Sequence, residues 1–224
     1  MKSQVVDPKS MMPETNADDR KSALRIGDLA PDFAARSTTG DFVLSDYRGQ
    51  WIILFSHPAD FTPVCTTEFV ALARAHSEFQ KRKCELVAMS IDSLFSHFAW
   101  LRMIRDRTGL EVRFPVIEDP TLVVAGAYGM VSDGDPDSAA VRTTFFIDPA
   151  GVVRATMCYP ADVGRSIPEL LRVLDSLQAV EDGGLAPADW QPGLPLIIRS
   201  DPDLDSVFGA SDEMAWYLPE VGDD

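Results

Sequence analysis

Cys65 stands at a position where a cysteine side chain can act as a nucleophile. It follows Thr62-Pro63-Val64, and a threonine before a proline is typical of a helix start, with Thr62 as the N-cap. Cys65 then lies in the first turn, where unpaired backbone N–H groups and the helix dipole favour a thiolate. Because the thiolate is the reactive form of cysteine, the segment predicts nucleophilic or redox chemistry. The alternative is that Cys65 is a small buried core residue.

The other two cysteines offer no evident partner for Cys65. Cys84 opens a predicted buried strand and Cys158 closes one, so both are interpreted as core thiols. A thiol–disulfide oxidoreductase normally carries Cys-x-x-Cys, whereas Thr62 and Glu68 occupy the positions three before and three after Cys65. Three scattered cysteines also make neither a disulfide scaffold nor a zinc knuckle.

The histidines and the overall charge argue against a metal ion, nucleic acid or an anionic membrane as a ligand. Three histidines without metal-ligand spacing predict no metal site, and His76 and His97 are interpreted as boundary or solvated residues. Acyl transfer by a Cys65–His57 pair stays an alternative, although no Asn or Asp partner is evident. The formal net charge of −15 argues against nucleic acid and anionic membranes as partners, since both are bound through clustered positive charge.

Hydropathy predicts neither a membrane helix nor a secretory signal. No apolar run reaches the roughly 20 residues that a membrane helix needs. Residues 1–23 are polar, with two prolines and a short charged run, and lack the apolar segment of a signal peptide. We therefore expect a mobile N-terminal tail over 1–23 and a cytoplasmic protein.

Strands and helices alternate around Cys65. Trp51–Phe55 is a continuous apolar run, which predicts a strand buried on both faces. Further apolar runs predict strands at 85–91 and 143–147 and a hairpin strand at 152–157. Helical spacing predicts helices at 66–80, at 94–108 and at 166–178. The second has Phe98, Leu101 and Ile104 or Arg105 along one side and Gly109 as its stop, and the third has a Ser166/Glu169 capping box. This order predicts an α/β thioredoxin-like fold over residues 24–180, a central mixed sheet flanked by helices.

A small irregular module is predicted at residues 181–224. Glu181-Asp182-Gly183-Gly184 ends the regular pattern, and prolines interrupt every later apolar cluster. Trp190, Leu196–Ile198 and Trp216–Leu218 are expected to be exposed within the chain. A segment this short cannot bury such side chains alone, so we expect it to contact a partner subunit in a homodimer or a larger homo-oligomer.

The segment around Cys65 resembles the peroxiredoxins. Pro58-x-x-x-Thr62-x-x-Cys65 matches their signature, and the string from His57 to Glu68 is similar to the one-cysteine type related to peroxiredoxin 6. The resemblance extends over about 24–218 and includes Ser90-Ile91-Asp92-Ser93 and Gly164-Arg165. It implies a thiol-dependent peroxidase that reduces hydrogen peroxide and small organic hydroperoxides, with no metal or organic cofactor.

The resemblance also implies the roles of four catalytic residues. Cys65 looks like the peroxidatic cysteine, which attacks the peroxide and becomes a sulfenic acid. Thr62 resembles the threonine whose hydroxyl hydrogen-bonds the peroxide, and Pro58 the proline that shields the thiolate from water. Arg142 matches the arginine that holds the thiolate and polarises the peroxide, a role suited to its permanent charge and fixed donors. A solvated loop position is the alternative for Arg142.

Three supporting residues follow from the same resemblance: His57, Glu68 and Arg165. They would complete the hydrogen-bond network around the pocket, although Glu68 could instead be an exposed carboxylate and Arg165 a surface residue. No cysteine follows Cys158, so a resolving cysteine in a C-terminal extension is absent. An external thiol, glutathione or a thioredoxin-like protein, would then be the reductant. A thiol–disulfide oxidoreductase and an oligomeric chaperone are the alternative functions, and the chaperone would not need Cys65.

Overall fold

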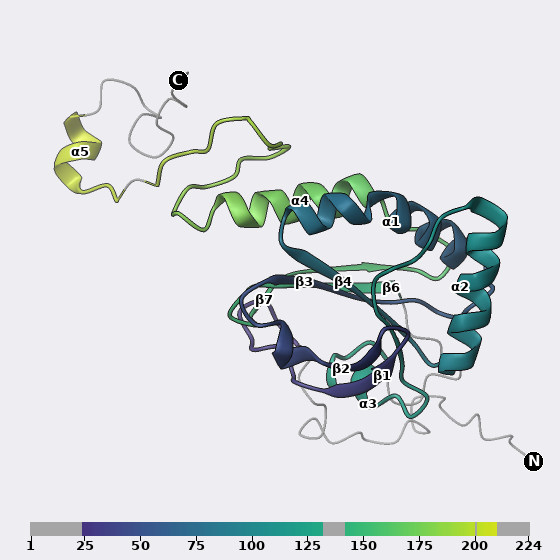
Figure 1. Ribbon diagram of the computed structural model, residues 1–224. Coiled ribbons are helices and arrows are strands. Elements are labelled where there is room, and N and C mark those ends of the chain that lie inside the picture. Colours follow the sequence, from purple (N-terminus) through teal and green to yellow (C-terminus); the bar gives the residue numbers. More distant parts are fainter. Residues whose placement is uncertain (1–23, 132–141, 200, 210–224) are drawn as a thin grey trace, which may run out of the picture.

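The computed structural model describes residues 24–131, 142–199 and 201–209. The predicted mobile tail at 1–23 and the apolar cluster at Trp216–Leu218 lie outside this part of the chain. Seven strands form one mixed sheet in the order β2-β1-β5-β4-β3-β6-β7 (Figure 1). The strands are β1 (Ala34–Ser37), β2 (Gly40–Val43), β3 (Trp51–Ser56), β4 (Cys84–Ser90), β5 (Val116–Glu118), β6 (Arg142–Ile147) and β7 (Val153–Tyr159). The helices are η2 (Leu44–Tyr47, a 3₁₀ helix), α1 (Pro63–Lys81), α2 (Leu94–Thr108), α3 (Val123–Ala127), α4 (Ile167–Ala179) and α5 (Leu204–Gly209).

Alternate residues of the central strand β3 enter two separate cores. Ile53 and Phe55 pack on one face of the sheet with Phe69 of α1, Trp100 of α2 and the buried stripe of α4. Ile52 and Leu54 point to the other face, toward β2 and α3. Figure 1 shows α1 and α4 side by side over the first face. The predicted α/β sheet with helices on its faces is therefore confirmed.

Two parts of the sheet were not predicted from the sequence. The β1–β2 hairpin and β5 are three to four residues long. The hairpin alternates buried and exposed positions only once or twice, and β5 is too short to show any alternation. Periodicity cannot separate such short runs from irregular backbone.

The predicted ends of α2 are right, and its predicted apolar side is right at Leu101 and Ile104 but wrong at Phe98. The helix spans Leu94–Thr108 and ends at Gly109, whose φ of 72° is the left-handed conformation that glycine adopts most easily. Its buried residues are His97, Trp100 and Ile104, while Phe98 is exposed. The stripe runs through a histidine, which hydropathy does not count as a core residue. The prediction that His97 is a boundary or solvated residue is therefore wrong as well.

The capping box of α4 is only half formed. Ser166 Oγ accepts from the Glu169 backbone N–H at 3.4 Å, as predicted. The Glu169 carboxylate does not return the bond, because it accepts from the Arg172 guanidinium at 2.7 and 2.8 Å instead. A salt bridge one turn along the helix thus replaces the second capping bond.

Cys158 and Trp190 differ from their predicted surroundings. Cys158 is exposed because β7 is the edge strand beside β6, so the expected core thiol is wrong. Trp190 is buried rather than exposed. Its indole N–H donates to the Leu194 carbonyl at 2.8 Å, and the Arg172 guanidinium of α4 donates to the Trp190 carbonyl. The start of the C-terminal segment is thereby attached to α4.

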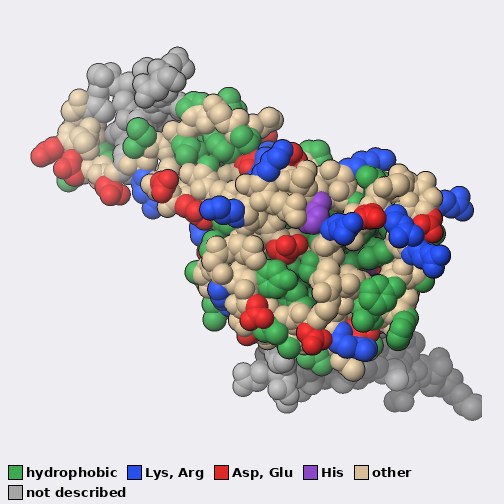
Figure 2. Space-filling model, viewed as in Figure 1, with side chains coloured by type: hydrophobic (Ala, Val, Ile, Leu, Met, Phe, Trp, Pro, Cys, Tyr) green, Lys and Arg blue, Asp and Glu red, His purple; other side chains and the backbone are tan. Residues whose placement is uncertain are grey.

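Beyond Trp190 the chain leads away from the sheet (Figure 1). Its only regular features among the described residues are one β-bridge between Leu185 and Ile197 and the short helix α5. Figure 2 shows hydrophobic side chains gathered on this segment, and four of them are more than half exposed: Leu194, Ile198, Leu204 and Phe208. No helix among the described residues is both long and apolar enough to cross a membrane.

Candidate active site

The first turn of α1 holds Cys65 at the end of β3. Thr62 is the N-cap residue in extended backbone and Pro63 begins the helix, as predicted. The Thr62 hydroxyl does not cap the helix, because it donates to the Ala59 carbonyl at 2.8 Å. Its oxygen therefore keeps a lone pair for another donor. Cys65 is fully buried, whereas Thr62 and Pro58 are partly exposed on the loop that leads to it.

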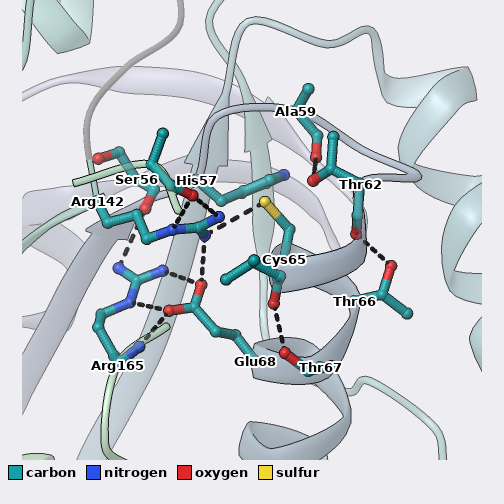
Figure 3. A network of polar contacts seen from close by, with 12 residues as sticks. Ser56, His57, Ala59, Thr62, Cys65, Thr66, Thr67, Glu68, Arg142 and Arg165 are labelled. Carbon is teal, nitrogen blue, oxygen red and sulfur yellow. Dashed lines mark hydrogen bonds and ion pairs between the residues drawn. The ribbon is translucent and has the colours of Figure 1, made fainter. Parts of the chain in front are cut away.

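Arg142 places a guanidinium beside the Cys65 sulfur (Figure 3). It is the first residue of β6, which pairs antiparallel with β3. Arg142 therefore lies at the same end of the sheet as the C-terminal end of β3, from which the chain leads into α1. Its Nη1 is 3.3 Å from Cys65 Sγ, and its Nε and Nη2 donate to the Ala161 carbonyl at 3.1 and 2.7 Å. The side chain is buried, so the alternative of a solvated loop arginine is wrong.

Glu68 joins two arginines one turn after Cys65. Its carboxylate accepts from Arg142 Nη1 at 2.8 Å, and from the Nε, Nη2 and backbone N–H of Arg165 at 2.9, 2.8 and 2.7 Å. Burial acts to raise the pKa of Glu68, but the Arg165 hydrogen bonds outweigh it and lower that pKa. Glu68 is therefore a buried carboxylate and not an exposed one.

Arg165 links this cluster to the sheet. It lies just before α4, and its Nη1 donates to the Ser56 carbonyl at 3.1 Å and to Thr144 Oγ1 at 3.2 Å. Its guanidinium stands 4.8 Å from the centre of the Phe55 ring, within cation–π range. Arg165 is buried, so its alternative as a surface residue is also wrong.

The charges of this cluster favour a thiolate. Two guanidiniums and one carboxylate leave a net charge of +1 in a region closed to water. A thiolate at Cys65 makes the total zero, whereas a thiol leaves one buried charge without a counterion, which is costly. The geometry thus supports the nucleophilic chemistry that the helix position predicts.

A second buried polar group lies next to this site, and sequence reasoning named its His57 but missed the partners Asp60 and His97. His57 Nε2 lies 3.0 Å from Asp60 Oδ1 and His97 Nδ1 lies 2.8 Å from Asp60 Oδ2. One potential ligand atom of each side chain lies within 4.8 Å of the others, so among the described residues these three form a group that could hold a metal ion. Those atoms are joined to one another by hydrogen bonds. The only sequence signal was the 3.6-residue spacing of His97 with Trp100 and Ile104.

Arg142→Lys should slow the oxidation of Cys65 by roughly 10- to 100-fold, as expected for lost hydrogen bonds to charged groups worth about 1.5–3 kcal/mol. Lysine keeps the charge but cannot bind Cys65, Glu68 and Ala161 at once with a planar fork. Stopped-flow kinetics with hydrogen peroxide would measure the change. Arg172→Lys on α4 is the matched control and should leave the rate unchanged. Equal rates for Arg142→Lys and the wild type would contradict a positioning role.

Comparison with known proteins places the chain among peroxide-reducing relatives. The model of the AhpC/TSA family matches residues 26–156. "Peroxiredoxin 2" of Caldanaerobacter subterraneus subsp. tengcongensis is 48% identical over 175 residues, which cover 78% of this chain and 79% of the relative.

Two solved structures are similar throughout most of their length. One is a yeast mitochondrial 1-Cys peroxiredoxin, described with a thiol resolving mechanism via glutathione/thioredoxin systems. It has a TM-score of 0.77 and 39% identity, covering 87% of this chain and 97% of that one. The other is a cysteine-to-serine variant of the peroxiredoxin 6 of Arenicola marina, with a TM-score of 0.74, 32% identity, and coverage of 88% and 90%. These likenesses confirm the predicted thioredoxin-like fold.

Proposed function

The chain belongs to the AhpC/TSA family of peroxiredoxins, and from this premise we propose that it reduces hydrogen peroxide and small organic hydroperoxides by a one-cysteine mechanism at Cys65. As a peroxiredoxin it is a thiol-dependent peroxidase, an oxidoreductase that acts on peroxides. The observation that carries the assignment to Cys65 is its sulfur, 3.3 Å from the Arg142 guanidinium in a cluster that a thiolate makes neutral.

The proposed first step forms a sulfur–oxygen bond and breaks the O–O bond. The Cys65 thiolate attacks the terminal peroxide oxygen, the O–O bond breaks, and the proton of the attacked oxygen passes to the leaving alkoxide or hydroxide, which departs as alcohol or water. Sulfur is oxidised to the sulfenate and the peroxide is reduced. Arg142 would stabilise the developing charge, and Thr62 would accept the peroxide O–H, since its own proton is used at Ala59. Pro58 on the same loop would limit water access to the sulfur.

The positions of the other cysteines support the one-cysteine mechanism. Cys84 pairs with Trp51 at the start of β3, whereas Cys65 follows the end of that six-residue strand, about 20 Å away. Burial raises the pKa of Cys84, so that thiol is also a poor nucleophile. Arg142 and Thr144 face the side of the sheet that α1 covers. Thr143 lies between them and faces the opposite side, and so does Cys158, which pairs with Thr143. Neither thiol is placed to resolve a sulfenic acid at Cys65 within one subunit.

An external thiol would then complete the cycle. It displaces the hydroxyl of the Cys65 sulfenic acid as water and forms a mixed disulfide, and a second thiol releases Cys65 reduced. Glutathione and thioredoxin-like proteins are the proposed donors, since the similar yeast enzyme is described with both systems.

The proposed subunit arrangement is a homodimer or larger homo-oligomer. We assign residues 24–180 to the peroxiredoxin domain and 181–224 to a C-terminal module that contacts a second copy. The exposed apolar side chains of the described part of this module, Leu194, Ile198, Leu204 and Phe208, support that contact.

One equivalent of hydrogen peroxide added to the fully reduced protein should add a single oxygen atom to Cys65. Intact mass spectrometry with peptide mapping would follow the product, and trapping of free thiols would show Cys84 and Cys158 still reduced. A disulfide that joins Cys65 to either of them would refute the one-cysteine mechanism while retaining the peroxidase. Recovery of the thiol on adding glutathione or thioredoxin would then identify the reductant.

A further inference from the structure

Asp60 lies at the centre of a buried polar cluster that the proposed reaction leaves unused. One of its carboxylate oxygens faces His57 Nε2 at 3.0 Å and the other faces His97 Nδ1 at 2.8 Å. The far nitrogen of His97, Nε2, faces the Ile117 carbonyl at 3.3 Å. All three side chains are closed to solvent. The polar atoms of these three side chains therefore depend on one another and on the Ile117 carbonyl for their hydrogen bonds.

Hydrogen-bond geometry determines which atoms carry those protons. A carbonyl and a carboxylate are acceptors only, so each nitrogen of His97 must donate a proton. The other possibility is a neutral Asp60 that donates to His97. Burial acts to raise the pKa of Asp60, but the hydrogen bonds of His57 and His97 outweigh it and lower that pKa to about 2. A doubly protonated His97 beside an ionised Asp60 satisfies both of these hydrogen bonds.

His57 is left with a free lone pair. Its Nε2–H donates to Asp60, and burial lowers the pKa of His57 despite the opposite effect of that carboxylate, so the ring is neutral. Its Nδ1 is buried and, among the described residues, has no hydrogen-bond partner. The ring is held between Trp100 and Phe69, with centroids at 5.4 and 4.9 Å. Figure 3 shows it on the same side of the sheet edge as Cys65.

We propose that His97 is a positioning residue of the peroxidase site, in which a buried imidazolium keeps Asp60 ionised so that Asp60 fixes the tautomer of His57 and the path of the 57–62 loop. The inference rests on the proposed function, because that loop carries Pro58 and Thr62. Asp60 also anchors the loop through its backbone N–H, which donates to Asp92 Oδ2 at 2.9 Å. Helix α2 thereby stabilises a catalytic loop on the opposite side of β3 from Arg142.

The surrounding charges act on this cluster from three elements. Arg165 faces His57 and disfavours a second positive charge there. Glu118 of β5 acts on His97 and favours the imidazolium. Asp92, at the start of the turn before α2, holds the Asp60 amide. Arg165 thus favours a neutral His57 and Glu118 a charged His97, while Asp92 holds the loop that carries Asp60.

The protonation states can be measured without any peroxide. Nitrogen NMR of the reduced protein labelled with ¹⁵N-histidine should show both nitrogens of His97 protonated near neutral pH, and His57 protonated at Nε2 alone. Spectra of His57→Asn and His97→Asn would assign the signals. An unprotonated nitrogen on His97 would overturn the proposal. Since the spectra do not depend on turnover, failure of the peroxidase assignment would leave this result intact.

Two His97 variants separate positioning from simple packing. In His97→Asn the amide nitrogen takes the place of Nδ1 and still donates to Asp60, whereas in His97→Gln it takes the place of Nε2 and donates to Ile117. We expect His97→Gln to slow Cys65 oxidation by about 10- to 100-fold and His97→Asn to restore most of that loss, as for one hydrogen bond to a charged group. His76→Asn on α1 is the control and should not change the rate. Equal rates for both His97 variants and the wild type would refute a positioning role. If a variant does not fold, the NMR spectrum of the wild-type protein alone tests the proposal.

Discussion

Cys65→Ser should lower the rate of reaction with hydrogen peroxide by at least about a thousandfold, the scale of losing a catalytic nucleophile. Serine preserves the size of the side chain and its place in the first turn of α1. Its hydroxyl stays protonated where a thiolate forms, and its oxygen cannot be oxidised by a peroxide. The positive cluster of Arg142, Arg165 and Glu68 would then have no anion to neutralise it.

Cys84→Ala and Cys158→Ala are the matched controls for that loss. Both thiols lie away from the reacting sulfur, Cys84 at the opposite end of β3 and Cys158 on the other face of the sheet. Stopped-flow kinetics should therefore give near wild-type rates for both. If Cys65→Ser reacted as fast as the wild type, the peroxidase assignment to Cys65 would be wrong. An assay of client aggregation that was unaffected by the same change would support the chaperone alternative.

Glu68→Ala should destabilise the fold by about 3–5 kcal/mol, the range seen when one partner of a buried ion pair is removed. Glu68 is the only carboxylate bonded to Arg142 and Arg165 among the described residues, and it accepts four hydrogen bonds from them. Alanine would leave two guanidiniums buried and short of acceptors. Chemical denaturation monitored by tryptophan fluorescence would measure the free energy of unfolding.

Glu169→Ala is the control for the Glu68 experiment. Its carboxylate also binds an arginine at 2.7 and 2.8 Å, but both side chains of that pair are about one-third exposed. Solvent screening limits such a pair to roughly 0–1 kcal/mol. If the two variants lost the same free energy of unfolding, the buried cluster around Glu68 would carry no special weight in the stability of the fold.

The sequence predicts the main strands and helices of this molecule better than it predicts the contacts of the buried polar side chains. The long apolar run at Trp51–Phe55 and the Thr62-Pro63 helix start identify β3, α1 and the place of Cys65, because these signals are local. The resemblance to peroxiredoxins supplies Arg142, Glu68 and Arg165 as neighbours of the sulfur. No spacing rule could do so, since Glu68 bonds to residues 74 and 97 positions away.

His97 shows why the remaining part of the site could not be predicted. Hydropathy assigns a histidine to the surface, yet the energetic cost of its burial is offset by Asp60, which comes from a different loop. Phe98, next to it, is more hydrophobic and is exposed. The buried side of α2 is thus decided by a polar pair that exists only in the folded chain.

The long-range contacts of Cys65 also bear on how the chain folds. Its guanidinium partner is 77 residues later in the sequence, and Glu68 is fixed by Arg165, 97 residues later. Contacts so distant in sequence form late, after the loops between them have closed. A growing chain that has exposed Cys65 but not yet synthesised β6 and α4 therefore carries an ordinary thiol. Under the proposed function, the sulfur would gain its reactivity toward peroxide only with the last elements of the domain, and the unfinished chain would be spared oxidation at Cys65.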